Sequence, residues 1–190
     1  MRSRWLAAGL LVVAGACGPD NAARPGQPVR KPLYFDVKGL LDVQTALLKQ
    51  QNPAVEKQVQ LRDGQPETAR VPRVDWSKEL QIFYQADINK SALRGAYSVL
   101  PPVQTAQGTQ QTYVRKPGIE NAVERLAVIF SGPAVREISA VLTQDNPLFF
   151  SRKKLVFTCL AGKLRSYRVE GLQKLVLFDT LRYSATARVL

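Results

Sequence analysis

Two acidic residues one helical turn apart, Asp75 and Glu79, have a spacing that could support acid–base chemistry. Two carboxylates that converge in a cleft can act as general acid and general base, as in carbohydrate hydrolysis. Asp75 also stands directly before a segment with helical periodicity, where an aspartate caps free backbone amides. Glu79 would then lie in the first helical turn, where a negative charge is favourable. We prefer the capping interpretation and keep a carboxylate-dependent hydrolase as an alternative.

The rest of the composition argues against most enzyme chemistry. The chain has 190 residues, with no His and two Cys. Without His there is no Ser-His-Asp triad, no imidazole base and no His-ligated metal. Two Cys cannot form a zinc site of four thiolates, and the sequence contains no glycine-rich nucleotide-binding loop. We therefore expect a non-catalytic protein without cofactor or metal.

Cys159 lies in the same strand phase as the apolar residues Leu155 and Phe157. This phase predicts a buried free thiol rather than a reactive one, since a nucleophilic Cys needs a nearby base. A disulfide with Cys17, the other Cys of the chain, is the alternative if Cys17 carries no modification.

Basic residues are concentrated at the end of the chain. The formal net charge is +12, and residues 151–190 hold nine basic and two acidic residues, a net charge of +7. Strand periodicity places four cations on the outward phase, which predicts a weak anionic-surface contact through Lys154, Arg168, Arg182 and Arg188. The candidate partners are lipid headgroups, acidic glycans and acidic proteins, and we expect no nucleic acid. A merely solvated face that discourages strand pairing is the alternative.

The N-terminus has the order of an export signal. Arg2 and Arg4 precede an apolar run from Trp5 to Ala14, and small residues follow. Ten apolar residues are too few for a transmembrane helix, which needs about 20. Residues 1–16 therefore read as a signal peptide that is removed.

The residues Ala14-Gly15-Ala16-Cys17 resemble the lipobox of bacterial lipoproteins, in which the Cys becomes the lipidated first residue. Ala14 stands where such lipoboxes usually have Leu, and Ala14-x-Ala16 also fits an ordinary signal-peptidase site. The resemblance implies a protein held to the bilayer by acyl chains on Cys17, because two or three chains anchor firmly. Gly18, rather than Asp, follows the Cys. By the enterobacterial sorting rule, this implies an outer-membrane protein that faces the periplasm.

Residues 17–32 form a predicted tether, and residues 33–190 a single domain. The tether contains four Pro and two Gly and few apolar residues, which is typical of an extended, semi-flexible segment.

Two amphipathic helices are predicted within the domain. Asp36 caps the first, which ends at Asn52-Pro53, and Asp75 caps the second, from Trp76 to about Asp87. The second helix places aromatic and aliphatic side chains on one face, which form either core or an apolar-ligand site: Trp76, Leu80 and Phe83. Core is the preferred interpretation.

The remaining segments alternate with strand periodicity. A hairpin is predicted over 55–61 and 67–71 around Asp63-Gly64, and Gly171 is predicted as a turn. Further strands are expected over 96–100, 112–116, 123–130, 135–142, 148–160, 164–170, 173–178 and 181–189. The predicted fold is α+β, a twisted or curved antiparallel sheet of about seven to ten strands whose apolar face is covered by the two helices.

The element order and size resemble the outer-membrane lipoprotein carriers and receptors, which bind acyl chains between sheet and helices. No residue motif carries this resemblance, so no binding residue is transferred. Our expectation is a membrane-anchored envelope lipoprotein that acts as a binding or scaffold module. A carrier or receptor for lipid or another apolar ligand is the second hypothesis, and it requires an open apolar cavity.

Overall fold

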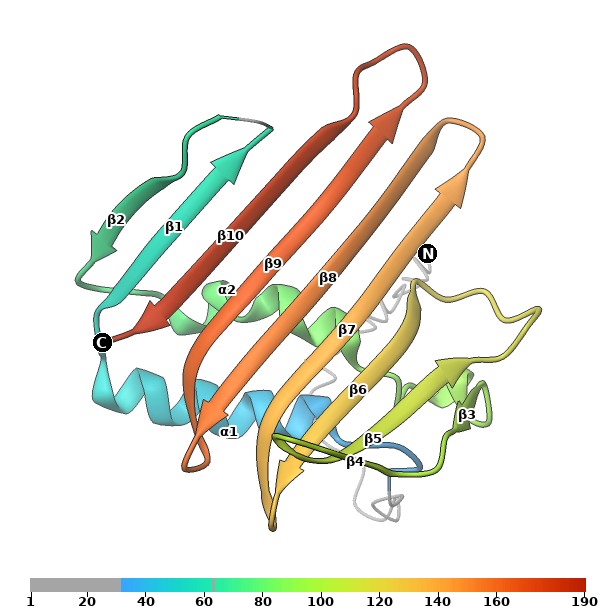
Figure 1. The fold of residues 1–190 in the computed structure, drawn as a ribbon, viewed down its shortest axis with the longest axis horizontal. Coiled ribbons are helices and arrows are strands. Elements are labelled where there is room, and N and C mark those ends of the chain that lie inside the picture. Colours follow the sequence, from blue (N-terminus) through green and yellow to red (C-terminus); the bar gives the residue numbers. More distant parts are fainter. Residues whose placement is uncertain (1–31, 63) are drawn as a thin grey trace, which may run out of the picture. The chain divides into compact units, whose positions relative to one another are not determined.

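A computed structural model describes residues 32–62 and 64–190. The predicted signal peptide, Cys17 and nearly all of the predicted tether lie outside the described residues. The described domain is one antiparallel sheet with strand order β2-β1-β10-β9-β8-β7-β6-β5-β3, and β4 pairs with β5 (Figure 1). The strands are β1 (Val55–Leu61), β2 (Glu67–Val71), β3 (Tyr97–Val99), β4 (Val103–Thr105), β5 (Gly108–Arg115), β6 (Val123–Ser131), β7 (Ala134–Asn146), β8 (Phe149–Leu160), β9 (Lys163–Leu175) and β10 (Leu181–Val189).

The helical segments all precede β3 in the chain. They are α1 (Val37–Gln51), α2 (Trp76–Glu79) and the 3₁₀ segments η1 (Gln81–Ala86) and η2 (Ser91–Leu93). Figure 1 shows α1 and α2 on the same side of the sheet. We call this side the inner face and the opposite side the outer face. The predicted α+β class, the antiparallel sheet and its strand number are confirmed.

Strand β8 shows why only one side of the sheet is covered. Its alternate residues Leu155, Phe157 and Cys159 are buried, whereas Lys154 and its neighbours of the same phase are not. Successive side chains of a strand point to opposite faces, so this pattern needs one dry face and one wet face. The predicted phase of this strand is confirmed.

Helix α1 begins and ends where the sequence predicts. The Asp36 carboxylate accepts a hydrogen bond from the Gly39 amide at 2.8 Å, and Asn52 ends the helix in the left-handed conformation. A buried Gln44 then joins α1 to the turn between β8 and β9. Its side chain donates to the Gly162 carbonyl at 2.8 Å and accepts from the Leu164 amide at 2.8 Å. These two bonds fix the helix at one position along the sheet.

The second helix is not the single continuous helix that the sequence predicts. The segment is one short α-helical turn, α2, followed by the 3₁₀ helix η1. Leu80, Phe83 and Ala86 are all buried and are spaced by three residues. A 3₁₀ helix has three residues per turn, so this spacing aligns them on one face. Packing against the sheet therefore favours the tighter helix.

Gly171 is not a turn, as the sequence suggested, but lies inside the continuous strand β9. It pairs with Tyr183 on β10, and a Cβ at Gly171 would lie 2.4 Å from the Tyr183 ring. The glycine therefore leaves room for the ring rather than ending the strand. A second difference is β4, a short strand without apolar alternation that pairs with the first part of β5.

Strand β1 pairs with β10 along all of its seven residues, from Val55 opposite Val189 to Leu61 opposite Tyr183. The predicted hairpin of β1 and β2 is confirmed by its register, with Val55 opposite Val71. The first and last strands of the domain are therefore neighbours.

The core lies between the inner face and the helices. The Phe83 ring packs edge-on against the rings of Phe157 and Tyr167, with centroid distances of 5.5 and 5.8 Å. Such aromatic pairs stabilise beyond the area they bury. Phe157 is 1% exposed, so its whole ring contributes to the core.

Replacing Phe157 with Ala should lower the free energy of unfolding by about 3–5 kcal/mol, since a buried ring is lost and a cavity remains. Thr158→Ala, one residue along on the outer face, is the matched control and should cost less than about 1 kcal/mol. Urea unfolding of both variants measures the difference, and equal losses would contradict the assigned faces.

Candidate functional site

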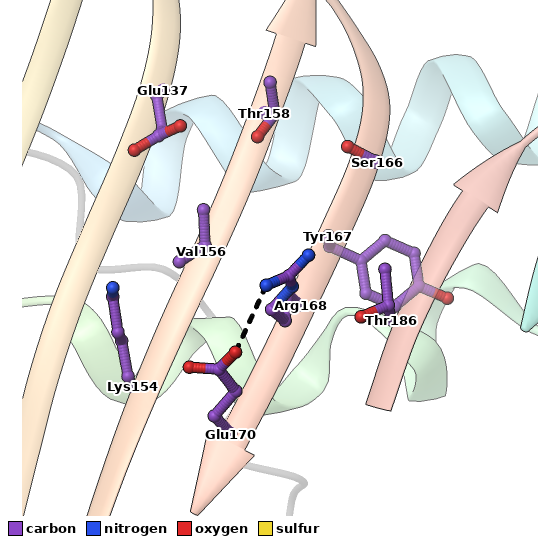
Figure 2. Close-up of a pocket in the computed structure, with 9 residues that line it drawn as sticks. All are labelled: Glu137, Lys154, Val156, Thr158, Ser166, Tyr167, Arg168, Glu170 and Thr186. Carbon is purple, nitrogen blue, oxygen red and sulfur yellow. Dashed lines mark hydrogen bonds and ion pairs between the residues drawn. The ribbon is translucent and has the colours of Figure 1, made fainter. Parts of the chain in front are cut away.

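The outer face is hollowed over its central strands. One hollow has a volume of about 320 Å³ and is lined by residues of β7, β8, β9 and β10. Figure 2 shows these residues. Cross-strand pairs build it, with Lys154 opposite Glu170 and Val156 opposite Arg168. Its lining residues are Glu137, Lys154, Val156, Thr158, Ser166, Tyr167, Arg168, Glu170 and Thr186.

A second hollow of about 460 Å³ adjoins the first, and the two share Lys154 and Glu170. It is lined by Val141, Arg152, Lys153, Lys154, Glu170, Gly171, Leu172, Arg182 and Tyr183. We call the two together the outer hollows. Their polar and cationic side chains stand beside aliphatic ones such as Val141 and Leu172, so the surface suits a partner that carries both anionic and apolar groups.

The cations of the outer face differ in how they are paired. Arg168 contacts Glu170 at 3.2 Å, and Arg188 contacts Glu56 on β1 at 3.1 Å. Within residues 32–62 and 64–190, Lys154 and Arg182 form no ion pair. These two side chains are exposed, so their charge is available to an incoming anion.

The structure brings together three of the four predicted anionic-contact residues. Lys154, Arg168 and Arg182 line the outer hollows, whereas Arg188 lies on the same face beside Glu56. Sequence reasoning missed Arg152, which lines the larger hollow and lies 4.0 Å from Glu124. Its even position on β8, in phase with Lys154, was the signal that could have found it.

Between the helices and the sheet, the described residues enclose a void of about 10 Å³. It is lined by Val37, Leu41, Phe83, Ala86, Ile138, Ala140, Leu155 and Phe157. A void of that size could hold about one water molecule. The predicted apolar-ligand or core residues Trp76, Leu80 and Phe83 are all buried here as core.

The two predicted carboxylates have structural contacts. Asp75 accepts hydrogen bonds from the amides of Ser77 and Lys78 at 3.1 and 3.4 Å, as predicted for a cap. Glu79 accepts from the Lys57 ammonium at 2.6 Å and from the Tyr167 hydroxyl. Both oxygens of Glu79 are therefore engaged, and the contact ties α2 to β1 and β9.

Cys159 is a free thiol buried on the inner face. Burial raises its pKa to about 11, so the thiolate needed for nucleophilic chemistry is scarce near neutral pH. In the described part of the chain, no three Cys, Asp or Glu side chains gather closely enough to hold a metal ion. Across the same part, no helix has both the length and the apolar character to cross a membrane.

No family model, curated protein or solved structure matches this chain. Its function is therefore inferred from its own residues and their geometry.

The Glu79 contact should make stability sensitive to alkaline pH. Burial, and then the hydrogen bond to Glu79, raise the pKa of Tyr167 above its usual value of 10.0. Above about pH 10 the unfolded chain loses this phenol proton while the folded chain keeps it, so stability falls as pH rises. Burial raises the pKa of Tyr97 to about 12, which adds to the same trend.

Replacing Tyr167 with Phe should lower the free energy of unfolding by about 1–2 kcal/mol near neutral pH, because Glu79 loses a donor. The same variant should lose less stability than the wild type between neutral pH and pH 11. Urea unfolding at both pH values measures this difference. An unchanged alkaline loss would show that Tyr167 does not control it.

Proposed function

We propose that this chain is a lipid-anchored envelope protein whose domain of residues 33–190 works as a non-catalytic binding module. In this proposal Cys17 carries the acyl chains, and the outer hollows bind a partner that presents carboxylate or phosphate groups. The setting is the outer membrane, on the periplasmic side. The proposal is for a role in envelope assembly or within a larger envelope complex.

The observation that carries the binding role is that two exposed cations of the larger hollow, Lys154 and Arg182, form no ion pair with any described residue. Lys154 and Arg182 stand exposed beside Leu172 and Val141, in a depression of about 460 Å³. A purely solvated strand face would need neither a depression nor aliphatic side chains beside its cations. Glu170, which lies opposite Lys154, forms its ion pair with Arg168 and not with Lys154.

The filled core favours this role over that of a lipid carrier. The void of about 10 Å³ that the described residues enclose there is too small for an acyl chain, so a carrier that used it would have to separate α1 and α2 from the inner face. The hydrogen bonds of Gln44 and the Lys57–Glu79 ion pair oppose that movement.

The use of Asp75 as a cap and of Glu79 as a tie between elements supports a non-catalytic role over the hydrolase alternative. Glu137 and Glu170 are the acidic side chains of the smaller outer hollow. Glu170 is paired with Arg168, which favours a charged surface over an acid–base pair.

Cys17→Ala should abolish lipidation, leaving an uncleaved precursor or a soluble product. The physical reason is the loss of the thioether that joins the acyl chains, each buried methylene of which contributes about 0.8 kcal/mol to membrane binding. Mass analysis of the processed N-terminal peptide of the wild type should show added acyl mass. A bare Cys at that position would refute the anchor.

Reversing both unpaired cations, Lys154→Glu with Arg182→Glu, should weaken partner binding by about tenfold or more, because attraction becomes repulsion. Stability should change by less than about 0.5 kcal/mol for each exposed substitution. The matched control is Lys90→Glu with Arg94→Glu, an equal charge change at exposed residues outside the outer hollows.

The measurement is capture of partners from envelope fractions by the wild type and both variants, with proteins, lipids and glycans analysed by mass spectrometry. A molecule retained by the wild type and the control, but lost by the hollow variant, identifies the partner class. If both variants retain the same molecules, the outer hollows are only a solvated surface.

A further inference from the structure

Two neighbouring hairpin turns at one end of the sheet, together with the strand end beside them, carry exposed apolar side chains. They are the turns between β7 and β8 and between β9 and β10, which lie at the same end of the strands (Figure 1). We call this surface the apolar tip, and its residues are Leu148, Leu175, Val176, Leu177 and Phe178.

The most exposed of these residues lie in the β9–β10 turn. Leu177 is 97% exposed and Phe178 is 69% exposed, while Leu148 in the adjacent turn is 70% exposed. A hydrogen bond from the Val176 amide to the Leu148 carbonyl, 3.1 Å long, holds the two turns together. Single exposed apolar residues are ordinary, but a contiguous group marks a contact surface.

The backbone conformation of the β9–β10 turn keeps these side chains exposed. Leu177 has a φ of 72°, in the left-handed region that L residues other than Gly, Asn and Asp rarely adopt. The Phe178 amide donates to the Leu175 carbonyl at 3.2 Å, which closes the turn. The turn therefore leaves the Leu177 side chain almost fully exposed, at a conformational cost.

We propose that the apolar tip inserts shallowly into the bilayer to which Cys17 is attached. The inference rests on the proposed lipid anchor for its nearness to that bilayer. The described domain starts 15 residues after Cys17, and an extended chain of that length spans at most about 50 Å. The 13-residue strand β9 is about 43 Å long, so such a tether is long enough for the tip to reach the membrane.

The shape and charge of the tip fit a lipid surface. It consists of projecting turns rather than a groove, and insertion of a few side chains to the headgroup–acyl boundary needs only a projection. Lys174 and Arg182 flank the β9–β10 turn, where long cationic side chains can reach phosphate groups. Asp179 is the acidic residue of this turn.

The test places a tryptophan at the tip of the full mature chain, reconstituted through its own acyl chains. Phe178→Trp is compared with Leu160→Trp, which is 62% exposed in the wild type and ends β8 at the opposite end of the sheet. Trp76 is buried and gives both variants the same background. The vesicles contain phosphatidylethanolamine and phosphatidylglycerol, with either ordinary or brominated acyl chains.

Emission from Phe178→Trp should fall to roughly half in brominated vesicles, since insertion brings the indole to the acyl boundary. Emission from Leu160→Trp should stay at its value in ordinary vesicles. Adding Leu177→Asp to Phe178→Trp should restore the emission without lowering the thermal midpoint, because Leu177 makes almost no contacts.

Two outcomes would overturn the insertion. One is equal quenching of the two tryptophans in a protein whose Cys17 peptide carries acyl mass. The other is a blue shift of Phe178→Trp that depends on protein concentration without vesicles, which would assign the tip to a second copy. A bare Cys17 peptide, with quenching kept when the chain is added to vesicles, would refute the anchor and leave the tip supported.

Discussion

The alternation of side chains along each strand is the constraint on which the rest of the structure depends. A strand has two faces, and the helices of residues 32–62 and 64–190 form one layer, so within this part of the chain they cover the inner face alone. Phe157 and Leu155 are buried as a result, and Lys154 and Val156 stay at the surface. The same alternation that builds the core also builds the outer hollows, and changes on one face leave the other in place.

Polar contacts on the inner face fix the helices at defined positions. Gln44 fastens α1 to the β8–β9 turn, and Glu79 fastens α2 to Lys57 and Tyr167. Apolar packing alone has little directional preference, whereas buried polar groups must meet particular partners. The covered face is therefore rigid, and the binding role that we propose falls to the outer face, whose long cationic side chains can adapt.

Local sequence signals predicted much of the fold, and contacts between distant residues account for the remainder. Asp36 and Asp75 act as caps, and the bounds of β1, β2 and β10 match their alternation. The prediction of a turn at Gly171 was wrong, because this position needs a glycine to make room for the Tyr183 ring, which lies on another strand. Strand alternation correctly placed Lys154, Arg182 and Arg188 on one face of the sheet. It could not show that Arg188 is paired with Glu56, because these residues are 132 positions apart in the sequence. Contacts between distant strands depend on the register of the sheet, which no single strand encodes.

The pairing of β1 with β10 sets an order for the completion of the fold. A chain that emerges from its N-terminus releases β1 early and β10 last, and an isolated two-stranded hairpin is marginally stable in water. Until β10 is available, the backbone of β1 lacks its partner strand along the edge that includes Val55 and Val59. Strands β5 to β10 form a run of sequential hairpins that can assemble locally. The nascent domain therefore stays open, and exposed to chaperones or to aggregation, until β10 is free to pair with β1.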